Sequence, residues 1–149
     1  MSSLRITITI ALAIVLSSAP VAAEKPSPFA MAEADLTAET GGGARMVIDP
    51  ATSRARLIQF PAGSLRFKGA NPMEKAGRFF ARYGELLGVR DATHDLELVR
   101  SDSDQMGMTH LIFRQSYGDV PVFGAEMRVH LDPEGEIVTV NGTLVPDLA

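Results

Sequence analysis

Residues 108–142 read MTHLIFRQSYGDVPVFGAEMRVHLDPEGEIVTVNG, and this stretch decides the fold. Apolar and polar residues alternate along it, and turn-forming residues separate three runs, which is the pattern of successive antiparallel strands. The middle run alternates apolar residues with charged residues or histidine: Ala125, Met127, Val129 and Leu131 against Glu126, Arg128 and His130. The stretch therefore predicts a sheet with one buried face and one face in water.

The segment between the second and third runs predicts a hairpin turn. Residues 132–135 read Asp-Pro-Glu-Gly, which suits a type I turn because proline presets φ at the second position and glycine is favoured at the fourth. A tight turn there sets the register of the two strands. The expected cross-strand pairs are Val129 with Val138, Met127 with Val140, Ala125 with Gly142, and Arg128 with Thr139.

The hairpin before it is less regular. A two-residue turn at residues 118–119 brings Leu111 opposite Glu126, so an apolar face meets a charge. A one-residue bulge within residues 120–124 repairs this mismatch. Pro121 has no N–H for the ladder and a glycine follows three residues later, so the segment is typical of a bulge or an edge.

Residues 115–126, QSYGDVPVFGAE, followed by His130-Leu131-Asp132 and Val140-Asn141-Gly142, resemble the fungalysin/thermolysin propeptide (FTP) domain. The resemblance spans roughly residues 45–146 and is greatest from His110 onward. It implies a pro-region of a secreted zinc metallopeptidase, which folds ahead of the peptidase, assists its folding and keeps it inactive. Many members have an arginine where this chain has Ile112, so an ionic contact through that position is not carried over.

The resemblance implies that the domain works by binding a secreted thermolysin-type (M4) zinc metallopeptidase. The contact surfaces that we expect are the solvent-exposed face of the sheet and its exposed edge. The candidate partner-binding residues are Gln115, Tyr117, Pro121, Phe123 and Glu126. A purely structural alternative is that Tyr117 and Phe123 close the core of the hairpin.

The resemblance also implies that further modules follow such a domain, usually one of the PepSY type and then the peptidase. This sequence ends at Ala149, so a peptidase partner is expected to act in trans. Two alternatives stay open. One is a stand-alone exported structural or ligand-binding domain without a peptidase partner, and the other is a truncated remnant of a metallopeptidase precursor.

The N-terminal residues 1–23 have the pattern of a secretory signal peptide. Arg5 gives a positive start, residues 6–16 are an apolar run, and small residues at 21–23 suit cleavage. The run is too short to span a bilayer, although a retained anchor is the alternative. We therefore expect an exported protein, secreted or periplasmic.

Composition excludes several function classes. The net charge of −4 and the pI of about 5.3 do not suit nucleic-acid binding. The chain has no cysteine, so disulfides, thiolate metal sites and a cysteine nucleophile are all impossible. A 149-residue chain can bury enough surface for one domain.

The sequence predicts an α+β fold in which an antiparallel sheet packs against one main amphipathic helix. Residues 24–43, rich in proline, glycine and acids, are expected to form a mobile lead-in to a domain at 44–149; the alternative is a short docked helix over 29–36. Strands are expected at 45–49, 54–60 and 94–100, with a possible short strand at 64–67 and a polar turn at 101–107.

The main helix is predicted over residues 72–87. Asn71 can cap it, Glu74 can answer that cap, and Gly88 ends it. Apolar residues recur at spacings of three and four and form a stripe for the sheet to cover: Met73, Ala76, Phe79, Phe80, Tyr83, Leu86 and Leu87.

No motif for catalysis is present. The HExxH pair of zinc peptidases, the GxSxG serine elbow and the phosphate-binding loop do not occur. The three histidines, His94, His110 and His130, fall on separate predicted strands; two of them could meet across neighbouring strands, but metal-ligand spacing is missing. We therefore expect neither enzymatic activity nor a metal or other cofactor.

Overall fold

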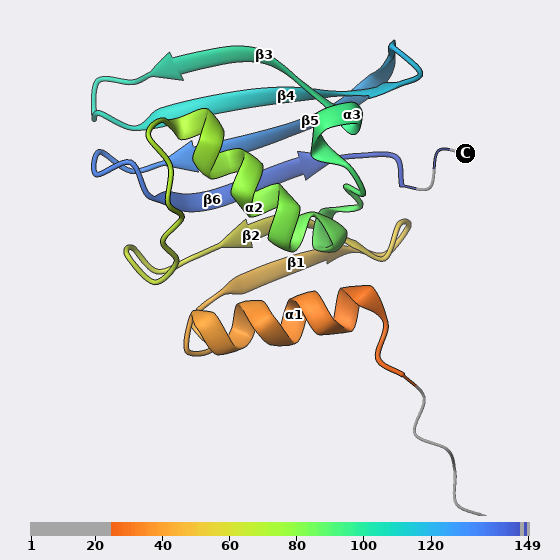
Figure 1. Cartoon of the computed structure of the whole chain (residues 1–149), viewed down its shortest axis with the longest axis horizontal. Coiled ribbons are helices and arrows are strands. Elements are labelled where there is room, and N and C mark those ends of the chain that lie inside the picture. Colours follow the sequence, from red (N-terminus) through yellow and green to blue (C-terminus); the bar gives the residue numbers. More distant parts are fainter. Residues whose placement is uncertain (1–24, 147, 149) are drawn as a thin grey trace, which may run out of the picture.

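The computed structural model describes residues 25–146 and 148, and the expected signal peptide at 1–23 lies outside them. The fold is α+β, with a six-stranded antiparallel sheet in the order β1-β2-β6-β5-β4-β3 and helix α2 lying across one face (Figure 1). None of the described helices has the length and apolar character needed to cross a membrane. The elements are α1 Pro28–Glu39, β1 Arg45–Asp49, β2 Arg54–Gln59, α2 Pro72–Leu87, α3 Ala92–Asp95, β3 Leu96–Ser103, β4 Thr109–Tyr117, β5 Val120–Leu131 and β6 Ile137–Thr143.

Helix α2 begins and ends as the sequence predicts. The Asn71 side chain accepts a hydrogen bond from the Glu74 N–H at 2.9 Å. The Glu74 carboxylate in turn accepts from the N–H of Ala70, one residue before the cap. At the other end Gly88 has φ of 82°, a left-handed conformation that glycine adopts without strain. Local sequence thus fixes both ends of this helix.

The hydrophobic core lies between α2 and the sheet, as predicted. Phe80 packs edge-to-face on Phe113 of β4, with ring centroids 5.3 Å apart. Met73 is the exception on the expected stripe, because it lies at the exposed start of the helix. The buried members of the α2 stripe and the sheet residues beneath them include Ala76, Phe79, Phe80, Tyr83, Leu86, Leu87, Ile58, Leu111, Met127, Val129, Leu131 and Val140.

Helix α1 corrects the expectation of a mobile lead-in over residues 24–43. Its Leu36 is buried in the core, and Asp35 forms an ion pair with Arg82 of α2 at 2.9 Å. The Tyr83 hydroxyl donates a hydrogen bond to the Glu39 carboxylate. The docked helix, which was the alternative, is therefore observed. Its apolar face is short, with Leu36 buried and Phe29 and Ala32 only half-buried, so the sequence pattern was weak and α2 supplies the docking contacts.

The register of β5 with β6 also corrects the prediction. Val129 pairs with Val140 and Met127 pairs with Gly142, which places β6 two residues away from the expected register. The connection is longer than a tight turn: Leu131 pairs with Ile137 after a bulge, and the Asp132 carboxylate accepts a hydrogen bond from the Glu136 N–H at 2.7 Å. A shift of two residues leaves Val140 and Gly142 on their predicted face, but the bulge brings Ile137 into the core and leaves Val138 half-buried.

Two other predicted strands differ from the structure. Residues 64–67 are not a strand. They belong to an irregular loop that starts with a turn at Pro61, and the loop buries the Leu65 side chain in the core. The expected strand at 94–100 begins later, at Leu96, because Asp91 caps the short helix α3 by accepting a hydrogen bond from the Thr93 N–H at 3.0 Å. His94 therefore lies on α3, and β3 continues to Ser103, into the expected polar turn.

Candidate functional site

The β4–β5 hairpin ends in the expected two-residue turn. Tyr117 pairs with Val120, and Gly118 and Asp119 between them both have positive φ, 52° and 64°. Positive φ at both central positions is typical of the type I′ hairpin turn, whose twist matches that of the flanking strands. This end of the sheet is at the upper right in Figure 1, close to α3.

A bulge follows the turn, as predicted, but it is larger than one residue. Ser116 pairs with Pro121, whereas Arg114 pairs with Glu126, so residues 122–125 of β5 all lie opposite Gln115. The glycine inside the bulge, Gly124, has φ of 72°. Beyond the bulge the apolar pairs are restored, with Phe113 opposite Met127 and Leu111 opposite Val129.

The bulge and the turn before it place apolar side chains in water. Phe123 is fully exposed, Val120 is 65% exposed and Tyr117 is 51% exposed, and Pro121 is exposed beside them. We refer to these four residues as the hairpin-end surface. The alternative in which Tyr117 and Phe123 close the hairpin core is wrong. A hairpin end that presents an aromatic ring to solvent is typical of a protein-binding surface.

The other two candidate contact residues behave differently. Glu126 is exposed on the sheet face that α2 leaves open, and its carboxylate lies 3.0 Å from the Arg128 guanidinium. Gln115 is only 5% exposed. Its amide donates to the Val145 carbonyl at 2.8 Å and accepts from the Val145 N–H at 2.9 Å. Gln115 therefore holds the segment after β6 and is not available to a partner.

Replacing Gln115 with leucine is expected to lower the free energy of unfolding by about 1–3 kcal/mol, because the N–H and C=O of Val145 lose their partners. Urea unfolding followed by circular dichroism measures the change. Ser116→Ala on the neighbouring residue is the control, with an expected change within about 0.5 kcal/mol. Equal effects of the two substitutions would contradict the structural role of Gln115.

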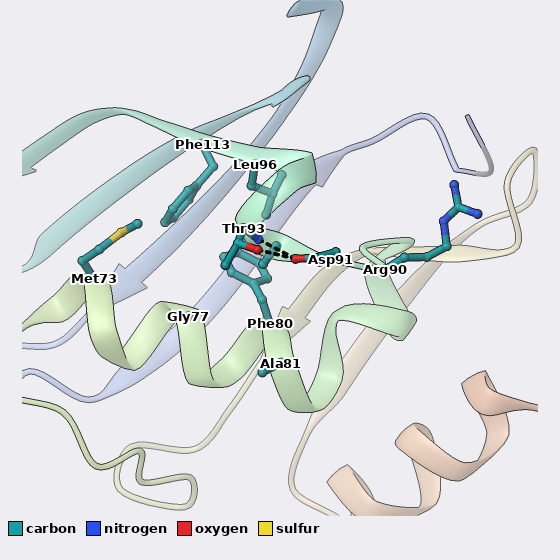
Figure 2. A pocket seen from close by; sticks show the side chains of 10 residues that line it. Met73, Gly77, Phe80, Ala81, Arg90, Asp91, Thr93, Leu96 and Phe113 are labelled. Carbon is teal, nitrogen blue, oxygen red and sulfur yellow. Dashed lines mark hydrogen bonds between the residues drawn. The ribbon is translucent and has the colours of Figure 1, made fainter. Parts of the chain in front are cut away.

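An apolar groove of about 570 Å³ lies between α2 and α3 at the β3–β4 edge of the sheet (Figure 2). Phe80, Leu96 and Phe113 project into it, while Arg90 points away. The rim is polar: hydrogen bonds from Thr93 and His94 lower the pKa of Asp91 to about 2. The residues that line the groove come from four separate elements, so no single stretch of the sequence indicated the groove. It can receive an apolar group.

The open face of the sheet carries a row of polar residues from four strands. Asp102 of β3 pairs with His110 of β4, which pairs with His130 of β5, which pairs with Thr139 of β6. The Nδ1 atoms of His110 and His130 lie 2.7 Å apart. His110 and His130 lie on separate strands, as predicted, and the cross-strand register brings their side chains together, whereas His94 lies on α3 and not on a strand.

The groups around this pair determine its electrostatics. Burial is the largest effect on His130 and lowers its pKa, and the neighbouring His110 and Arg128 act in the same direction. A hydrogen bond with His110 lowers the pKa of Asp104. In the described part of the chain, no group of three or more histidine, cysteine or acidic side chains is arranged to hold a metal ion.

Comparison with known proteins identifies the part of the chain that carries these features. Residues 94–144, from α3 to the end of β6, match the model of the Fungalysin/Thermolysin Propeptide Motif. A 57-residue stretch is 37% identical to the thermolysins of Alicyclobacillus acidocaldarius and Bacillus caldolyticus, and covers 38% of this chain. The thermostable neutral protease NprT of Geobacillus stearothermophilus is 34% identical over 62 residues, 42% of this chain.

These matches are partial on both sides. The matched stretches make up 10% of each thermolysin and 11% of NprT. No solved structure matches the chain. The matched residues include the whole β4–β5 hairpin, both paired histidines and Gln115, whereas α2 lies before them. Residues 94–144 of this chain therefore carry the fungalysin/thermolysin propeptide (FTP) motif.

Proposed function

We propose that this chain is a non-catalytic propeptide domain that binds a secreted thermolysin-type zinc metallopeptidase and assists its folding, inhibits it, or does both. The observation that carries the proposal is the fully exposed Phe123, held on a bulged hairpin inside the residues that match the propeptide motif. The similarity to the thermolysins supports the class of partner. An exported protein, with residues 1–23 as its signal peptide, suits that partner.

The hairpin-end surface suits this role because it is already ordered. Tyrosine and phenylalanine bring large contact areas with few rotatable bonds, so little side-chain entropy is lost on binding. The two-residue turn and the Gln115–Val145 hydrogen bonds hold the hairpin in one arrangement. A rigid surface of this kind can act as a template, which lowers the entropic cost of assembling the long-range contacts of a slowly folding partner.

The experiment is refolding of a thermolysin-type peptidase that lacks its own pro-region, with and without this chain. The recovered peptidase activity measures folding assistance, and titration of the chain against the folded peptidase measures inhibition. We expect a rise in recovered activity, a loss of activity on titration, or both. If neither quantity changes, and no complex forms on size-exclusion chromatography, the proposal fails.

Replacing Phe123 with alanine is expected to weaken binding to the peptidase by about 2 kcal/mol or more, which is roughly 30-fold in Kd, as for other buried aromatic anchors at interfaces. Surface plasmon resonance with the immobilised peptidase measures this change. Met106→Ala is the matched control, because Met106 is exposed in the β3–β4 turn, away from the hairpin end. An equal loss of affinity in both variants would mean that Phe123 is not the anchor.

The apolar groove favours a second candidate function, a stand-alone exported domain that binds an apolar ligand. Its volume of about 570 Å³ lies within the range of small-molecule pockets. Gly77→Leu tests this function, because a Cβ built at Gly77 meets no atom within 4 Å and a larger side chain there would fill the groove. Loss of binding of an apolar fluorescent probe in this variant would support the second candidate, and unchanged peptidase binding would separate it from the first.

A further inference from the structure

We propose that His110 and His130 form a binding site for one divalent cation of the imidazole-preferring class, such as Zn²⁺, on the open face of the sheet. The site is separate from the hairpin-end surface, and the proposal does not depend on a peptidase partner. The sequence alone did not indicate this site, because the two histidines are twenty positions apart and their side chains meet only through the β4–β5 register.

The two rings converge through the same nitrogen. His110 and His130 are directly opposite residues of neighbouring antiparallel strands, and their Nδ1 atoms are 2.7 Å apart. The ring centroids are 4.9 Å apart, and the ring planes are inclined by 70°. The two lone-pair positions therefore point at one place between the strands, where a single cation can meet both.

Both outer nitrogens are held by oxygen acceptors. Nε2 of His110 lies 3.1 Å from a carboxylate oxygen of Asp104, and Nε2 of His130 lies 2.8 Å from the side-chain carbonyl oxygen of Asn141. Each Nε2 therefore carries the proton and donates it, which leaves both Nδ1 atoms with lone pairs. This outer hydrogen bond is the arrangement that orients metal-binding histidines and raises their basicity.

Two facing lone pairs repel each other unless a positive charge lies between them. A proton can occupy that place, and so can a metal ion after a small adjustment. Zn²⁺ binds imidazole nitrogen at about 2.0–2.1 Å, so two tetrahedral ligands lie about 3.3 Å apart. The rings need to separate by only about 0.6 Å from the observed contact, which is within reach of side-chain rotation.

The surroundings allow a cation to enter and to be hydrated. The His110 side chain is 28% exposed, on the face that α2 leaves open. Two aspartates contribute negative charge near His110: Asp104 contacts it, and Asp102 lies opposite it on β3. Two arginines oppose this charge, because Arg100 contacts Asp102 and Arg128 lies near His130. With two protein ligands, the remaining coordination positions belong to water. This predicts a moderate affinity and not a structural zinc site.

The test is isothermal titration calorimetry of the untagged full chain with Zn²⁺ at pH 7.5. We expect one saturable site per chain, no comparable binding of Mg²⁺ or Ca²⁺, and loss of the site in His110→Gln and in His130→Gln. His94→Gln is the matched control, because His94 is exposed on α3 and also faces an aspartate, Asp91. Asp104→Asn is expected to weaken Zn²⁺ binding by about 10-fold, as for other groups that orient a metal ligand.

A measurement on the wild-type chain keeps the test independent of whether each variant folds. Proton NMR should show Zn²⁺ shifting the ring signals of His110 and His130 together, while those of His94 move little. The proposal is overturned if no saturable binding occurs, if His94→Gln removes the binding, or if the ring signals of the pair do not move. None of these outcomes bears on peptidase binding, so the two proposals can fail separately.

Discussion

Replacing Phe80 with alanine is expected to lower the free energy of unfolding by about 3–5 kcal/mol, the usual cost of removing a fully buried aromatic ring. Phe80 is buried on α2 and packs against Phe79 of the same helix and Phe113 of β4. Its loss would leave a cavity where helix and sheet meet. Because small domains have only about 5–15 kcal/mol of stability, a large share of the variant should unfold at low denaturant concentration.

Chemical denaturation followed by circular dichroism measures this effect, and Arg78→Ala is the control on the same helix. Arg78 is exposed, so its removal should change the free energy of unfolding by no more than about 0.5 kcal/mol. If Phe80→Ala lowers the free energy of unfolding by less than about 1 kcal/mol, α2 does not cover the apolar face of the sheet as observed. The central packing of this fold would then be wrong.

Replacing Gly142 with alanine is expected to cost about 3 kcal/mol or more, at the upper end of the effect of overpacking. Gly142 lies in β6 opposite Met127, and its φ is +153°, in the region that side-chain-bearing residues rarely adopt. A Cβ at this position would lie 2.8 Å from the Met127 Cα and closer still to the Glu126 carbonyl oxygen. Both are main-chain atoms, so no side-chain rotation can relieve the contact and the β5–β6 pairing has to shift.

The matched control is the same substitution at Gly77. This glycine is on α2, and a Cβ built there meets no atom within 4 Å. Gly77→Ala is therefore expected to stabilise the protein by about 0.5–1 kcal/mol, the gain of alanine over glycine inside a helix. Thermal unfolding of the two variants should move in opposite directions. A Gly142→Ala variant as stable as the wild type would contradict the observed register of β5 with β6.

The elements that the sequence predicted best are those whose signals are local. Helix α2 was predicted with its ends because Asn71 and Gly88 act within one turn of the chain. The buried face of β5 followed from simple alternation. Helix α1 was not preferred, since its stability depends on contacts of Leu36, Asp35 and Glu39 with the rest of the fold, and none of these is visible in its own pattern.

The candidate site also combines features that local sequence signals predicted with features that depend on the whole fold. The exposed Phe123 and Tyr117 were among the predicted contact residues, because the turn and bulge signals around them are local. Gln115, the other hairpin residue in β4 among the candidates, is buried instead, and the sequence did indicate this, because Gln115 continues the inward alternation of Leu111 and Phe113. The apolar groove was missed because its lining comes from α2, α3, β3 and β4.

The sequence by itself determined the three strands between residues 108 and 143, where the main helix begins and ends, and which face of the central strands is buried. Only the tertiary structure decided the strand register at both hairpins, the size of the bulge that exposes Phe123, and the meeting of His110 with His130. The physical reason is the range of the interactions. Periodicity and capping act within a few residues, whereas register and side-chain convergence depend on how turns, bulges and packed elements fit together across the whole domain.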